Sequence, residues 1–205
     1  MRVLFFVFLP LFSFAQHAVD TTATWLEENW QHRQKYIQDL YTDEHGPLEV
    51  EDTSFLDFFP FDSSFHIEAE IELLQDKDPI IMTTVNGSQK QYIPYLIARF
   101  SLAGVEQELT VYRSVRLMKI PMYSDYLFLP FYDHTNGEQT YGGGRYLDLK
   151  ISDLKENTIY IDFNRVYNPY CAFKSGYACP IPPVSNTVSG NIEAGEKSFQ
   201  KDQMH

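Results

Sequence analysis

Two segments in the C-terminal third of the chain carry residue types that could bind a small anionic or polar ligand. The first reads TYGGGRYLDL over residues 140–149, and its three consecutive glycines lose more backbone entropy on folding than other residues would. Glycines let backbone N–H groups approach an anion closely, and Arg145 would supply the matching charge. A β-bulge or a tight crossing at the start of a strand is the alternative use of these glycines.

The second segment reads YIDFNRVYNPYCAF over residues 160–173. If it begins as a strand, Ile161 and Phe163 face one side, and Asp162 and Asn164 face the other. The polar side could then join the glycine segment in one pocket. The ligand-binding residues that we predict are Tyr141, Gly143, Gly144, Arg145, Asp162, Asn164 and Asn168.

Arg145 has an unusual expected position, because it shares a strand face with Leu147 and Leu149. A guanidinium on such an apolar face needs a carboxylate or a bound anion. Asp148 and Asp162 are the nearest candidates in the sequence. A purely structural Arg–Asp pair is therefore the alternative to a ligand site.

Catalytic patterns are weaker. A hydrolase could use Asp162, or Asp133 with His134, as its general base. However, the sequence has no G-x-S-x-G nucleophile motif, and its six histidines form no HxH or HExxH spacing. We therefore expect no metal and no cofactor, and we leave enzymatic activity open with a preference against it.

Export from the cytoplasm is expected from residues 1–15, MRVLFFVFLPLFSFA, which have the charge, apolar run and small-residue cleavage site of a signal peptide. A membrane anchor is the alternative, but the apolar run is too short to span a bilayer as a helix. We expect a periplasmic or secreted protein that does not insert into the membrane after cleavage. An exported chain with two cysteines favours a Cys171–Cys179 disulfide over free thiols or a metal pair.

Length, composition and charge limit the number of domains and the classes of partner that we expect. The chain has 205 residues, 44% of them hydrophobic, and a net charge of −12. One folded domain is the default at this length, and the acidic balance argues against a nucleic-acid partner.

Residues 16–45 should form a helical segment, with a helix over residues 20–41 and an apolar stripe at three- and four-residue steps. The stripe residues are Leu26, Trp30, Arg33, Ile37, Leu40 and Tyr41.

The elements after the helix are strands. Residues 65–73 alternate apolar side chains with His66, Glu68, Glu70 and Glu72, which predicts a half-buried strand with an acidic outer face. Asn86-Gly87 is typical of a hairpin turn. The fold class that we predict is mainly β, an antiparallel β-sandwich or barrel of about 6–8 strands with one N-terminal helix packed on it. It forms one domain over residues 46–197, and residues 198–205 form a loose tail. Further strand-like runs cover residues 95–102, 108–115, 126–131, 145–151 and 158–166.

Several long motifs resemble a known family. TNG-x-x-TYGGGRYLDL, DFN-x-x-YNPYCAF, CPIPP and IEAGEK, which lie within residues 135–197, are similar to the bacterial family called domain of unknown function 1684. The resemblance extends more weakly to residues 46–62. It implies family membership and no particular activity.

Three functions therefore stand as hypotheses. The first is an exported module that binds a small anionic or polar ligand. The second is an envelope protein-interaction domain that uses the N-terminal helix or the acidic surface. The third is a hydrolase based on Asp162 or on Asp133 and His134.

Overall fold

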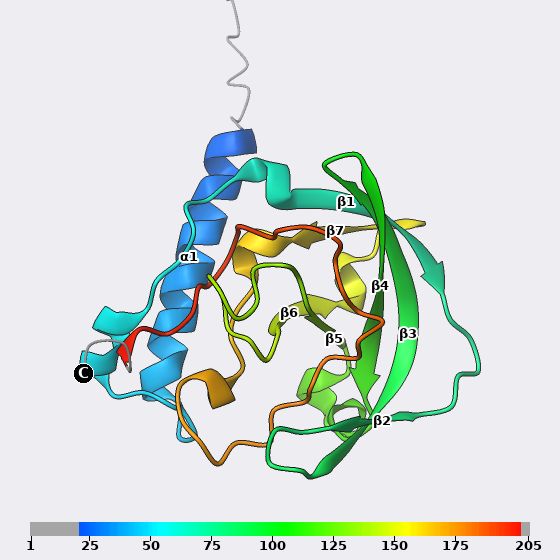
Figure 1. The fold of residues 1–205 in the computed structure, drawn as a ribbon. Coiled ribbons are helices and arrows are strands. Elements are labelled where there is room, and N and C mark those ends of the chain that lie inside the picture. Colours follow the sequence, from blue (N-terminus) through cyan, green and yellow to red (C-terminus); the bar gives the residue numbers. More distant parts are fainter. Residues whose placement is uncertain (1–20, 202–205) are drawn as a thin grey trace, which may run out of the picture.

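The computed structural model describes residues 21–201, so the predicted signal peptide lies outside the described residues. The fold is mainly β: seven strands pair antiparallel in a single curled half-barrel sheet, and one main helix, α1, lies beside it (Figure 1). This architecture confirms the predicted fold class. Within residues 21–201, no helix combines the length and apolar character needed to cross a membrane.

The strand order in the sheet is β6-β5-β4-β3-β1-β7, and β2 pairs with β3 off this path. Apolar and polar residues alternate along these strands, so that each strand has one face toward the core and one toward solvent. In residues 66–73 the glutamates lie on the exposed face. The short strand β2 was not predicted, although the Asn86-Gly87 turn that joins it to β3 was. The bounds are β1 His66–Leu73, β2 Ile80–Thr83, β3 Gln89–Leu102, β4 Val105–Ser114, β5 Tyr126–Phe131, β6 Arg145–Lys150 and β7 Thr158–Asp162.

The two edges of the curled sheet meet at one point. Tyr146 in the edge strand β6 forms an antiparallel bridge with Tyr167, which follows the other edge strand β7. The two backbone N–H groups donate to the opposite carbonyls at 3.0 Å each. The bridge draws the half-barrel toward closure and brings residues on both sides of it together.

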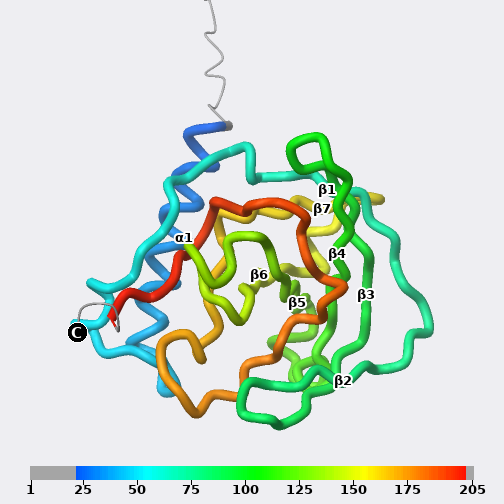
Figure 2. The backbone as a smooth tube through the Cα atoms, in the orientation of Figure 1, coloured from blue at the N-terminus to red at the C-terminus, as the bar shows by residue number. Residues whose placement is uncertain are grey.

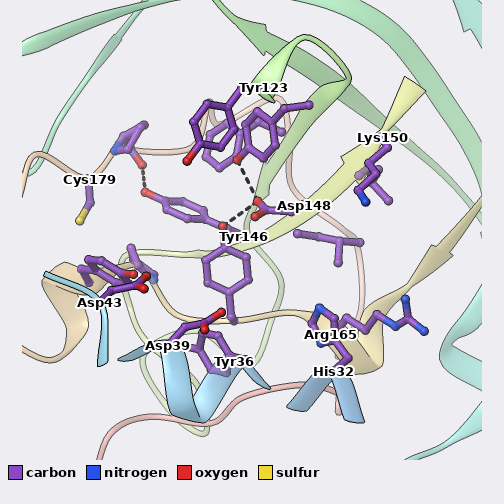
Figure 3. A pocket seen from close by; sticks show the side chains of 18 of the residues that line it. His32, Tyr36, Asp39, Asp43, Tyr123, Tyr146, Asp148, Lys150, Arg165 and Cys179 are labelled. Carbon is purple, nitrogen blue, oxygen red and sulfur yellow. Dashed lines mark hydrogen bonds between the residues drawn. The ribbon is translucent and has the colours of Figure 1, made fainter. Parts of the chain in front are cut away.

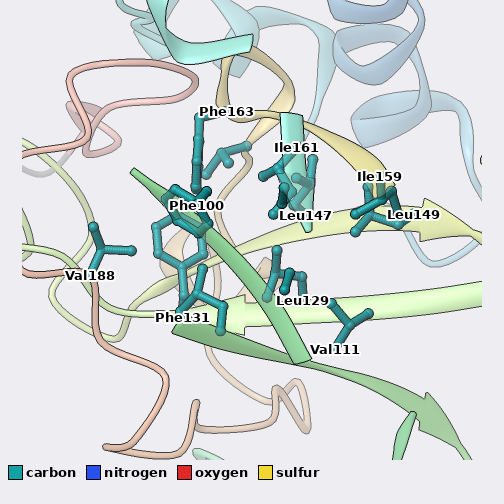
Figure 4. Packing of buried hydrophobic residues seen from close by; sticks show 14 of the residues in the cluster. Phe100, Val111, Leu129, Phe131, Leu147, Leu149, Ile159, Ile161, Phe163 and Val188 are labelled. Carbon is teal, nitrogen blue, oxygen red and sulfur yellow. The ribbon is translucent and has the colours of Figure 1, made fainter. Parts of the chain in front are cut away.

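The main core fills the inside of the half-barrel (Figure 4). Phe131 packs edge-on against Phe163 with ring centroids 5.5 Å apart, and Leu129 and Leu147 are almost fully buried beside them. The C-terminal segment, drawn orange to red, crosses in front of β5 and β6 and contributes Ile192 to this core (Figures 1 and 2). Burial of these side chains is the dominant favourable contribution to folding.

Helix α1, Thr21–Thr42, has the predicted extent but a different buried face. Leu40 is buried as predicted, whereas Leu26 and Trp30 are 46% and 52% exposed. The helix instead turns Asn29, which is 1% exposed, toward the domain. The predicted apolar stripe was therefore wrong at Leu26, Trp30 and Tyr41, which are all exposed. Near the N-terminus of the helix, polar hydrogen bonds rather than apolar packing hold it to the domain.

The end of the described chain is packed. Phe199 contacts Phe55 and Phe173 edge-on, with ring centroids 6.3 and 5.2 Å apart. Lys201 Nζ pairs with Asp52 at 2.7 Å. The expected loose tail therefore does not begin at residue 198, and residues 202–205 lie outside the described part of the chain.

Candidate functional site

Arg145 is fully buried, and both of its terminal nitrogens are bonded to its own chain. One of them, Nη2, donates to Asp133 Oδ2 at 2.9 Å and to the Ile192 carbonyl at 2.8 Å, and Nη1 donates to the carbonyls of Ala194 and Glu196. Burial lowers the pKa of the guanidinium, and the charge of Asp133 opposes this shift. The partner of Arg145 is thus Asp133, and neither Asp148 nor Asp162 pairs with it as the sequence suggested.

The glycine segment is crowded by the protein itself. A Cβ on Gly143 would lie 2.3 Å from the Tyr141 ring. Gly144 has φ +83°, and a Cβ there would lie 2.8 Å from the Phe131 carbonyl oxygen and from Pro182. At Gly144 the positive φ and the backbone contact require glycine without any ligand, whereas at Gly143 the contact is with the Tyr141 ring alone.

Asp162 and Asn164 join three separate parts of the chain. Asp162 Oδ2 accepts hydrogen bonds from Trp25 Nε1 at 2.8 Å and from Asn29 Nδ2 at 2.9 Å, both on α1. Its Oδ1 accepts from the backbone and side-chain amides of Asn164, and Asn164 in turn binds both backbone groups of Asp62. Both oxygens of Asp162 are therefore occupied, which leaves it poorly arranged as a general base.

Asn168 lies in a second buried network, with Glu196 and Tyr36. Glu196 Oε2 accepts from the Asn168 N–H at 2.8 Å and from the Tyr36 hydroxyl at 2.7 Å. Within the described residues, Glu196 Oε1 and Asn168 Oδ1 have no hydrogen-bond partner. Burial raises the pKa of Glu196 to about 7.

Asp133 of the proposed hydrolase pair, Asp133 and His134, is also hydrogen-bonded to protein groups. Asp133 is buried and accepts hydrogen bonds from Thr135 and Arg145, while its neighbour His134 is exposed. No group of three or more His, Cys, Asp or Glu side chains placed to hold a metal occurs in residues 21–201. Ligand binding by the seven predicted residues and catalysis by Asp162 or Asp133 remain predictions.

The Cys171–Cys179 disulfide is present, as predicted, with Cα atoms 6.2 Å apart. It closes a short loop that contains Tyr177, and Cys171 itself lies in the short helical turn Tyr170–Ala172. The Tyr170 and Tyr177 rings pack edge-on within this region at 5.3 Å. The bridge therefore fixes the loop that carries Tyr177, whose ring packs against Tyr170 just before the bridge.

A cavity of about 960 Å³ lies beside this loop, between α1 and the face of β5 and β6 opposite the main core (Figure 3). None of the seven residues predicted to bind a ligand lines it. Its volume is that of a small-molecule site. The residues around it come from α1, β3, residues 122–125, β5, β6, Asp153 and residues 165–180, and include His32, Lys35, Tyr36, Asp39, Asp43, Lys90, Tyr92, Tyr123, Tyr126, Phe128, Tyr146, Asp148, Lys150, Arg165, Tyr167, Tyr170 and Tyr177.

Aromatic rings form a connected wall along this cavity. Phe128 contacts Tyr92 at 5.4 Å and Tyr146 at 4.8 Å between ring centroids. Tyr146 contacts Tyr167 at 5.9 Å, and Tyr167 contacts Tyr36 of α1 at 5.6 Å. The Tyr146 hydroxyl is anchored by donating to the Pro180 carbonyl. The wall thus links α1, β3, β5 and β6 through a continuous series of ring contacts.

Asp148 is the carboxylate held within this wall. Its Oδ1 accepts hydrogen bonds from the Tyr126 hydroxyl at 2.8 Å and the Tyr167 hydroxyl at 2.7 Å (Figure 3). The side chain stays accessible to water inside the cavity, but surrounding protein displaces much of its solvent. This desolvation raises the pKa of Asp148, and the two hydroxyl donors oppose the shift. Burial, followed by the charge of Asp148, raises the pKa of both tyrosines, so they remain donors.

Charged groups at the cavity are partly paired with one another. Lys35 Nζ binds Asp39 on the next turn of α1 at 2.6 Å. Arg165 Nε donates to Asn29 Oδ1 at 3.1 Å. Burial lowers the pKa of Lys90, helped by the charge of Arg116. Asp148, by contrast, forms no ion pair with any of the described residues.

One feature of the sequence does point to this site, although it did not enter the predicted ligand-binding set. The alternation in β6 places Arg145, Leu147 and Leu149 toward the core, and the opposite face therefore carries Tyr146, Asp148 and Lys150. The sequence suggested Asp148 only as a partner for Arg145. The other walls of the cavity come from distant parts of the chain, and no local pattern connects them.

Comparison with known proteins establishes the family. The family described as protein of unknown function DUF1684 matches residues 52–197, well over half of the chain. The chain therefore belongs to this family, as its motifs predicted.

One solved structure is similar over most of its length. It is the solution NMR structure of an uncharacterized protein from Haloarcula marismortui, with a TM-score of 0.69 and 28% sequence identity. The match covers 88% of this chain and 98% of that chain. Among curated proteins, none matches this chain.

Proposed function

We propose that this protein binds a small polar organic molecule in the cavity beside Asp148. The observation that carries the proposal is an accessible carboxylate, held by two tyrosine hydroxyls, in an aromatic cavity of about 960 Å³. Binding sites for small molecules combine apolar and aromatic walls with a few fixed polar groups in this way. A carboxylate with a shifted pKa in a cleft is a further property of functional sites.

The cavity is a better candidate than the glycine segment for a physical reason. The terminal nitrogens of Arg145 and both oxygens of Asp162 are already bonded to protein groups. A ligand there would have to displace these buried bonds, at the cost of leaving their partners unsatisfied. In the cavity, by contrast, Asp148 is accessible without any rearrangement.

Two-dimensional ¹H–¹⁵N NMR of the mature protein tests this proposal with a panel of small amines, alcohols, carboxylates and sugars. We expect at least one compound to shift amide signals of β5, β6 and α1. Asp148→Ala should abolish these shifts, whereas Asp43→Ala, at another position lining the same cavity, should retain them. Shifts confined to residues 141–145, or no shifts from any compound, would contradict the proposal.

We also propose that the protein is exported, as residues 1–15 indicate. The disulfide supports this proposal, because disulfides persist mainly in oxidising compartments. Expression of the full chain in its own host, followed by intact-mass measurement of the fractionated protein, tests it. A periplasmic or secreted species that begins at Gln16 is expected, and an uncleaved cytoplasmic species would contradict export.

A further inference from the structure

We propose that the cavity recognises an organic ammonium ion, which binds beside Asp148 among the surrounding tyrosine rings. This inference rests on the proposed function and specifies the charge and chemical class of the ligand. It replaces the anionic ligand that the sequence suggested for the glycine segment.

The hydrogen bonds of Asp148 leave one of its oxygens available. Tyr126 and Tyr167 both donate to Oδ1, and no hydrogen bond from the described residues reaches Oδ2. An ionised carboxylate has about four acceptor positions, so an N–H donor or a positive charge can still bind there.

The protein supplies no cation of its own at this carboxylate. None of the ion pairs in residues 21–201 includes Asp148. Both groups that counter its desolvation are neutral hydroxyls. Four cationic side chains also line the cavity, Lys35, Lys90, Lys150 and Arg165, but none of them lies within ion-pair distance of Asp148. A carboxylate in partly desolvated surroundings is stabilised by an opposite charge, and a cationic ligand can provide it.

The surrounding rings favour the same ligand class. Tyr167 packs against Tyr36 and Tyr146 at ring-centroid distances of 5.6 and 5.9 Å, so several aromatic rings line one region around the carboxylate. Tyrosine rings attract cations through their electron-rich faces, and aromatic cages are a known means of binding organic ammonium ions. The net charge of −12 also favours the approach of cations over anions.

Calorimetric titration with matched pairs of compounds tests the charge directly. Choline is compared with 3,3-dimethylbutan-1-ol, its neutral isostere, and butylammonium with butan-1-ol. In at least one pair, we expect the cation to bind about tenfold more tightly or better than its neutral counterpart. Asp148→Asn should remove this preference, because its amide oxygen can still accept from Tyr126 and Tyr167 while the charge is lost. Asp43→Asn makes the same charge change elsewhere in the cavity lining and should retain the preference.

The outcomes separate this inference from the proposed function. If neutral compounds bind as tightly as the cations in both pairs, the ammonium site is wrong and the cavity remains a binding site. If no compound in either pair binds, the ammonium site is also wrong, and the NMR experiment with the compound panel then tests separately whether the cavity binds any other small molecule. Phosphatidylcholine vesicles form a second arm: co-sedimentation that Asp148→Asn abolishes would assign the ammonium ion to a lipid headgroup. Binding of a cation without co-sedimentation would assign it to a free small molecule.

Discussion

Arg145 and Glu196 are buried ionisable side chains that hold the C-terminal segment against the rest of the domain. Arg145 binds three carbonyls of residues 192–196 in addition to Asp133. Glu196 binds Tyr36 of α1 and the backbone of Asn168. At the level of single residues, these contacts predict effects on stability that a ligand-binding role would not produce.

Removing Arg145 should strongly destabilise the protein. Arg145→Met leaves Asp133 as an uncompensated buried charge and frees three buried carbonyls, which we expect to lower the free energy of unfolding by about 3–5 kcal/mol. Urea unfolding followed by circular dichroism measures this loss. Arg99→Met is the matched control, because Arg99 lies in an exposed ion-pair network and should change stability little. A fully stable Arg145→Met protein would contradict the structural role and restore Arg145 as a ligand-binding residue.

Glu196 should make stability fall as pH rises. Burial raises its pKa from 4.5 to about 7 in the folded protein, so the folded state keeps a proton that the unfolded state loses between these values. The stabilising contribution of this proton is complete below pH 4.5 and is lost as pH increases toward 7. Glu196→Gln cannot ionise and should therefore be more stable than the natural protein at pH 8, by about 1–3 kcal/mol.

Urea unfolding at pH 4.5 and pH 8 measures this difference. The advantage of Glu196→Gln should be smaller at pH 4.5, since both folded proteins are then uncharged at this position. Glu193→Gln, at an exposed position in the same segment, serves as the control and should show no such pH dependence. An equal effect of Glu196→Gln at both pH values would contradict the assignment.

At the level of secondary structure, α1 docks through polar contacts near its N-terminus. Trp25 donates to Asp162 at 2.8 Å and stacks on His66 with centroids 5.9 Å apart, whereas Trp30 is 52% exposed. Trp25→Phe keeps an aromatic ring and removes the donor, so we expect a loss of about 1–2 kcal/mol in urea unfolding. Trp30→Phe should have little effect. Equal effects of the two substitutions would show that the docking face has been misassigned.

The disulfide supports the loop that lines the cavity. Its short sequence separation of 8 residues corresponds to a stabilisation of about 2–3 kcal/mol from the restricted unfolded chain. Cys171→Ala/Cys179→Ala should show this loss in urea unfolding. The double variant should also weaken binding of a cavity ligand, because the loop that packs Tyr177 against Tyr170 at the cavity is no longer fixed. Unchanged affinity would show that the loop does not contribute to the site.

For the molecule as a whole, the sequence predicted the sheet better than the site. Strict alternation in residues 66–73 and 145–150 identified strands and placed Arg145 correctly on a core face. Alternation is a local property, so it can be read without knowing the fold. The predicted buried face of α1 was wrong near its N-terminus, because the hydrogen bond from Asn29 to Asp162 overrides the apolar pattern. These two residues are far apart in sequence, so no local pattern could reveal their contact.

The cavity could not be predicted in the same way. Tyr36, Tyr126 and Tyr167 come from a helix, a strand and a loop, and only the curled sheet brings them around Asp148. Aromatic residues are common in β-sheet cores, so their number alone indicated no site. The family match and the similar structure establish membership and fold, and the geometry of the cavity carries the proposal on function.

Binding of an ammonium ion beside Asp148 is tested most sharply by an isotope-filtered NOE measurement between the ¹³C,¹⁵N-labelled protein, without residues 1–15, and whichever unlabelled cation binds more tightly, choline or butylammonium. We predict contacts from the carbon-bound protons of the cation to the ring protons of Tyr126 and Tyr167, and their loss in Asp148→Asn. Contacts to the Tyr141 segment or the outer surface, with none to these tyrosines, would contradict the proposed site.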